Sequence, residues 1–99
     1  MTHPVDEKII GVHVGTFSVP RSFIENYPEA LLDFFRQECI VPVKAEMDFY
    51  SDSVHYTALG KNFEMVPMGR IPYHYLFNAT LEDAENGTGV KAVTLRRFN

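Results

Sequence analysis

The stretch SVPRSFIENYPEALLDFFRQECI, residues 18–40, holds the helical pattern around which the rest of this 99-residue chain is arranged. From Tyr27 to Glu38, apolar side chains recur every three to four residues, as on one face of a helix. Pro28 suits the first turn of such a helix, and Pro42 prevents its continuation. We predict one main helix here, preceded by a short turn from Pro20.

An alternating strand precedes the helix. Residues 8–17, KIIGVHVGTF, place Ile10, Val12 and Val14 on one side of an extended chain. We predict that this side meets the core, so that His13 points away from it.

A first hairpin follows the helix. Residues 43–50, VKAEMDFY, and 54–59, VHYTAL, alternate on either side of a short turn. The register that gathers the apolar side chains on one face sets Asp48 directly opposite His55. A slip of one residue would mix the two faces, so we predict this register.

A second hairpin ends the chain. Residues 73–83, YHYLFNATLED, and 90–98, VKAVTLRRF, are joined by ENGTG, whose Asn-Gly pair is a strong hairpin signal. A tight two-residue turn and a three-residue loop with a bulge give different registers. The second separates apolar from polar residues better, and it sets Ala79 opposite Leu95.

These elements predict an α+β fold. The chain is long enough for one domain, so residues 1–99 are expected to form a single small domain. We predict an antiparallel sheet of about five strands with one main helix packed on one face, in the order β-α-β-β-β-β. One helix cannot cover both faces of such a sheet, so the other face meets solvent or a partner.

The segment between the hairpins is unusually apolar for a loop. Residues 61–72, KNFEMVPMGRIP, include methionines, whose flexible side chains suit adaptable contact surfaces. One interpretation is an exposed interaction loop centred on Phe63, Met65, Met68 and Arg70. The alternative is a lid that packs on the core.

Composition excludes several function classes. Nine basic and thirteen acidic residues give a net charge of −4, which disfavours nucleic-acid binding because that depends on cationic contacts to phosphate. Cys39 is the sole cysteine, so neither an internal disulfide nor a cysteine-built zinc site can form. No apolar stretch is long enough to span a bilayer, and MTHPVDEK at the N-terminus does not resemble a signal peptide. We predict a cytoplasmic protein that does not bind membranes.

Histidines offer the best candidates for chemistry. By strand phase, His13, His55 and His74 all point away from the apolar face, and with Asp48 they could form a metal-dependent enzyme site. Against this, no His-x-His or His-x-x-x-His spacing supports chelation. The chain also lacks a Gly-x-Ser-x-Gly elbow and a glycine-rich phosphate loop. We therefore predict no enzyme activity, no cofactor and no metal, with the three histidines as the alternative.

The uncovered sheet face is the predicted binding surface. Its candidate residues are Asp48, Tyr50, His55, His74, Asn78, Arg96 and Phe98. We predict a non-enzymatic interaction module that uses this face or an edge strand to contact a partner protein or a second copy of itself. A small, nucleotide-like ligand on the same face is the alternative.

In size, mild acidity and lack of a catalytic signature, the chain resembles the small accessory proteins of phage and mobile elements. That resemblance implies a protein that binds and modulates a host component.

Overall fold

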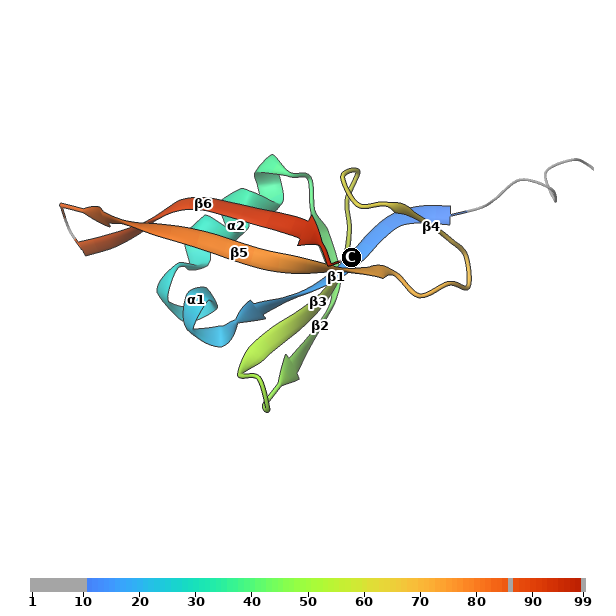
Figure 1. Ribbon diagram of the computed structural model, residues 1–99, viewed down its shortest axis with the longest axis horizontal. Coiled ribbons are helices and arrows are strands. Elements are labelled where there is room, and N and C mark those ends of the chain that lie inside the picture. The colour runs from blue at the N-terminus through green and yellow to red at the C-terminus, as the bar shows by residue number, and fades with distance from the viewer. Residues whose placement is uncertain (1–10, 86, 99) are drawn as a thin grey trace, which may run out of the picture.

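Six strands form a mixed sheet, with two helices against one face, in the part of the chain that the structure describes, residues 11–85 and 87–98. This computed structural model is drawn in Figure 1. The elements are β1 (Gly11–Pro20), α1 (Arg21–Asn26), α2 (Pro28–Gln37), β2 (Val41–Asp48), β3 (Ser53–Leu59), β4 (Met65–Pro67), β5 (Tyr73–Ala84) and β6 (Gly87–Arg97). The predicted α+β class and its one main helix, α2, are confirmed. The prediction of a purely antiparallel sheet of about five strands was wrong.

The strands lie in the order β2-β3-β1-β5-β6, and the short β4 pairs with β1. β3 and β4 both run antiparallel to β1, whereas β5 runs parallel to it. The parallel pair arises because the chain reverses once between β4 and β5. Gly69 makes this reversal with a positive φ of 84°, and the Arg70 N–H donates to the Pro67 carbonyl.

Two separate strands, β3 and β4, pair antiparallel with different parts of the central strand β1. β3 pairs with Val14–Pro20 and β4 pairs with Gly11–His13, while residues 60–64 leave the sheet between them. The Gly60 N–H donates to the His13 carbonyl at the start of this excursion. The excursion brings Phe63 beneath the sheet, where 5% of its surface is exposed.

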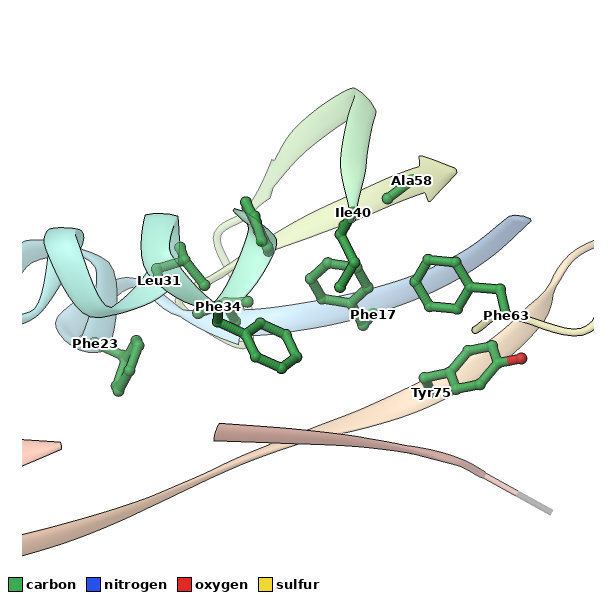
Figure 2. Packing of buried hydrophobic residues seen from close by; sticks show 10 residues of the cluster. Phe17, Phe23, Leu31, Phe34, Ile40, Ala58, Phe63 and Tyr75 are labelled. Atoms are coloured by element: carbon green, nitrogen blue, oxygen red, sulfur yellow. The ribbon is translucent and has the colours of Figure 1, made fainter. Parts of the chain in front are cut away.

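The core lies between the helices and the face of β1 that carries Gly15, Phe17 and Val19. Phe17 and Val19 are fully buried, and the Phe17 ring packs edge-on against Phe35 of α2. The cluster consists of Phe17, Val19, Phe23, Leu31, Phe34, Phe35, Ile40, Ala58, Phe63 and Tyr75, most of which Figure 2 labels. We call this side of the sheet the helix face.

The predicted phase of the first strand was wrong in part. Val14 is buried, but Val12 is 42% exposed, and Ile10 lies outside the described residues. Phe17 and the residues alternating with it form the helix face instead.

The C-terminus of α2 closes as a Schellman motif. Cys39 takes the left-handed conformation with a φ of 55°, and its N–H donates to the Arg36 carbonyl. The Ile40 N–H donates to the Phe35 carbonyl, which returns the chain to the core. This geometry explains how an exposed cysteine can precede a buried isoleucine.

Both hairpin registers differ from the prediction by two residues. Glu46, not Asp48, lies opposite His55, because the turn occupies four residues rather than two. Val93, not Leu95, lies opposite Ala79. A shift of two residues leaves side chains on their predicted faces, so the apolar pattern could not distinguish these registers. Beyond the bulge at Lys91 the second hairpin is shifted by three residues, and Leu81 lies opposite Val90 rather than Val93.

Candidate functional site

Two histidines meet on the sheet face opposite the helices, which we call the open face. The rings of His55, on β3, and His74, on β5, stack with centroids 5.9 Å apart and an interplanar angle of 10°. They meet above β1, which separates their strands and carries the small side chains of Thr16 and Ser18 there. Each histidine Nδ1 lies 3.1 Å from a hydroxyl oxygen, Thr16 Oγ1 for His74 and Ser18 Oγ for His55. These hydrogen bonds hold both rings in place.

Three more candidates lie beside this pair. The Phe98 ring packs edge-on against His74 at 6.4 Å. Asn78 and Arg96 line a hollow of about 350 Å³ over β5 and β6, together with Leu76, Phe77 and Thr94. The structure therefore brings His55, His74, Asn78, Arg96 and Phe98 to one region of the open face.

Asp48 and Tyr50 do not join them. Asp48 ends β2, where its carboxylate accepts the Tyr50 backbone N–H at 3.0 Å. Hydrogen bonds from the Ser51 side chain and the Tyr50 backbone lower the pKa of Asp48. Its carboxylate thus stabilises the turn, and the Tyr50 side chain is fully exposed. The charge of His55 is the smallest of the causes that lower the Asp48 pKa, so Asp48 contributes little to the region around the two histidines.

His13 is also separate, so the prediction that three histidines share one face was wrong. It lies five residues before Ser18, about 16 Å along an extended strand. It belongs to the same side of β1 as Gly15 and Phe17, and its Nδ1 lies 2.8 Å from the Phe63 carbonyl oxygen. Within residues 11–85 and 87–98, no group of three or more His, Cys, Asp or Glu side chains could hold a metal ion.

The predicted interaction loop divides into two parts. Phe63 belongs to the core, where its ring contacts Tyr75 edge-on at 4.9 Å. Met65, Met68 and Arg70 are exposed. Phe63 thus packs on the core as the lid interpretation predicted, whereas the interaction role of the three exposed residues stays a prediction.

A groove between α2 and β6 was missed by the sequence analysis. It consists of two hollows of about 240 and 220 Å³ that share Phe34 and Val93, and we call it the α2–β6 groove. The first hollow is lined by Phe34, Glu38, Ile40, Gly60, Asn62, Phe63, Tyr75, Val93, Thr94 and Leu95. The second is lined by Ala30, Asp33, Phe34, Gln37, Val90, Lys91, Ala92 and Val93.

The widths of the predicted sheet and helix could have revealed this groove. Five strands spaced about 4.8 Å apart are about 19 Å wide, whereas one helix is about 10 Å across. A single main helix must leave an outer strand partly uncovered. Val93 and Leu95 on β6 are accordingly only half-buried, although they belong to the helix face.

The histidine pair predicts a pH-dependent stability. Burial and the neighbouring His55 lower the pKa of His74 below its ordinary value of 6.5. Since unfolding restores the ordinary pKa, protonation favours the unfolded chain. The contribution of His74 to the free energy of unfolding is thus complete above about pH 6.5. It is lost as the pH falls through the lowered pKa that His74 has in the folded protein.

We expect the melting temperature to fall between about pH 7.5 and about pH 5, and His74→Gln to reduce that fall. Thermal unfolding followed by circular dichroism measures it. Asn78→Ala is the control, because Asn78 lies on the same strand and face and does not titrate. If the melting temperature fell equally with pH in the wild type and in His74→Gln, the histidine pair would not be the cause of that fall.

No known protein family, curated protein or solved structure matches this chain. Within the described residues, no helix is both long and apolar enough to cross a membrane.

Proposed function

We propose that this protein is a non-enzymatic interaction module that binds an extended segment of a partner protein along β6. The observation that carries the proposal is an accessible edge strand with a groove directly beside it, the larger hollow of which is lined mainly by apolar surface. Adding a strand to a sheet edge provides backbone hydrogen bonds, and adjacent hollows select the side chains.

The two outer strands of the main sheet differ in how well their edges are protected. Figure 1 shows β2 and β6 at opposite sides of the sheet. β2 contains Pro42, which lacks an N–H, and a bulge between Pro42 and Lys44. Both features discourage pairing with another strand. In β6 the single bulge lies at Lys91, so Ala92–Arg97 is a regular run without proline.

The α2–β6 groove suits side chains of an added strand. A cavity of about 150 Å³ can hold benzene, so the larger hollow, at about 240 Å³, can accept one large apolar side chain. Phe34, Val93 and Leu95 provide apolar surface in its wall. Thr94 also borders this hollow although its side chain belongs to the open face, so the hollow reaches the backbone of the edge strand.

Selection from a displayed library of random peptides tests this function. We expect enriched peptides to shift the backbone amide NMR signals of Ala92–Arg97 and of the groove residues. Val93→Lys should abolish their binding, and Val43→Lys, which places the same charge on β2, should not. Circular dichroism checks that both variants fold. Peptides that shift β2 or the open face instead, or the absence of any enriched peptide, would contradict the proposal.

A second candidate function is the binding of a small anionic ligand on the open face. It is favoured by the hollow that contains Asn78 and Arg96 and begins at Leu76, two residues along β5 from His74. Arg96 makes no ion pair with any residue that the structure describes. Titration with adenosine monophosphate in the same NMR experiment distinguishes the two functions, since it should shift His74, Asn78 and Arg96 rather than the groove. We do not propose the metal-dependent enzyme, because His13 lies apart from the other two histidines.

A further inference from the structure

The edge at β6 is basic although the whole chain is acidic. Between Gly87 and Phe98 the charged residues are Lys91, Arg96 and Arg97, and none is acidic. Arg97 already contacts Glu64, with Nη1 3.4 Å from Oε1. Lys91 and Arg96 have no carboxylate in ion-pair distance among the described residues. The edge therefore offers two unneutralised cations to a docked segment.

Strand geometry determines where a docked segment would place its side chains. Alternate residues of an extended segment lie on one side, about 6.6–7 Å apart. Two of them can enter the two hollows of the α2–β6 groove, while their neighbours lie on the side of the open face. On that side of β6 the exposed residues are Ala92, Thr94 and Arg96.

From these observations we infer that the partner segment is acidic and apolar in alternation, with two apolar residues separated by one polar residue and flanked by carboxylates. The inference rests on the proposed function and specifies its partner. The apolar residues enter the two hollows, and a flanking carboxylate pairs with Arg96 on the side of the open face.

A second copy of the chain fits this edge less well. Antiparallel pairing of two β6 strands about Thr94 would set Lys91 opposite Arg97 and Arg96 opposite Ala92 of the other copy. Such a dimer would bring the cations of both strands together without a carboxylate from either strand. Like charges directly opposite each other are unfavourable in a sheet.

Two synthetic peptides test the inference. Thr-Glu-Leu-Thr-Leu-Glu-Thr carries the inferred pattern and reads the same in both directions, so it serves parallel and antiparallel docking. Thr-Lys-Leu-Thr-Leu-Lys-Thr reverses its charge. NMR titration of the full chain gives both dissociation constants, and we expect the glutamate peptide to bind about fivefold more tightly. Salt at about 0.5 M should reduce this preference.

Arg96→Glu provides the decisive comparison. It should weaken binding of the glutamate peptide, strengthen binding of the lysine peptide, and leave the fold intact because Arg96 is exposed. Arg70→Glu, an equal charge change at another exposed position, should leave both constants unchanged.

The outcomes separate this inference from the proposed function. Equal binding of both peptides at β6 would overturn the inferred charge but support strand addition. Binding of neither peptide at β6 would contradict both. A concentration-dependent dimer in sedimentation, with protected β6 amides, would assign the edge to a second copy and overturn the inferred partner.

Discussion

Replacing Phe63 with alanine is expected to lower the free energy of unfolding by about 3–5 kcal/mol. Phe63 is 5% exposed and comes from the excursion between β3 and β4. The centroid of its ring lies 6.3 Å from that of Phe17 and 4.9 Å from that of Tyr75, which it contacts edge-on. Figure 2 labels these three residues in the core. Truncation removes these contacts and leaves a space that the rigid sheet cannot close. Urea unfolding measures the effect.

Phe49→Ala is the matched control for this prediction. Phe49 is 84% exposed in the turn between β2 and β3, so the same truncation should change stability by less than about 0.5 kcal/mol. Equal losses for the two variants would mean that the excursion does not anchor Phe63 in the core.

The sequence was sufficient to predict the helix and the two hairpins. Their apolar patterns are local: α2 repeats at helical spacing, and β5 alternates through Tyr75, Phe77 and Ala79 toward the core. The parallel pairing of β1 with β5 was not predictable in this way. It depends on the reversal at Gly69, where a single glycine in a long apolar connection gives no indication of the side on which the chain returns.

The first strand shows a different limit. Val12 and Val14 alternate as a core face would, yet Val12 is exposed, and the side of β1 that packs on the helices is the one that includes Gly15 and Phe17. The glycine hides the pattern, because its position is filled by rings from distant segments. The sequence alone does not show that Gly15 faces the core, because the rings of Phe63 and Tyr75 that fill its place come from distant parts of the chain.

The sequence indicated which residues share the open face, but it did not indicate how they are arranged on it. Alternation correctly placed His74, Asn78 and Arg96 on the face away from the helices, because a two-residue register shift does not exchange faces. The stacking of His55 on His74 was not predictable, since it requires β1 between their strands. The α2–β6 groove was missed because it arises from the relative widths of helix and sheet.

Gly15→Ala is expected to destabilise the fold by about 1–3 kcal/mol, although alanine is ordinarily favoured over glycine within a strand. A Cβ at Gly15 would lie 2.6 Å from Phe63 Cδ1 and 2.8 Å from Tyr75 Cε1. These distances are too short for carbon atoms in contact, so both rings would have to move within a packed core. Gly60→Ala offers a graded comparison, since its nearest contacts, at 3.1 Å, are to the opposite edge of the same Phe63 ring. We expect a smaller loss there.

A double-mutant cycle between Gly15→Ala and Phe63→Ala identifies the cause of that loss. If the clash with Phe63 dominates, Gly15→Ala should cost about 1–2 kcal/mol less when Phe63 is already alanine. Tyr75 still faces the new methyl group, so the relief should be incomplete. Additive losses would show that the strand resists alanine for another reason. Relief would demonstrate that Gly15 makes room for the excursion, and thereby for the aromatic wall of the α2–β6 groove that Phe63 and Tyr75 form.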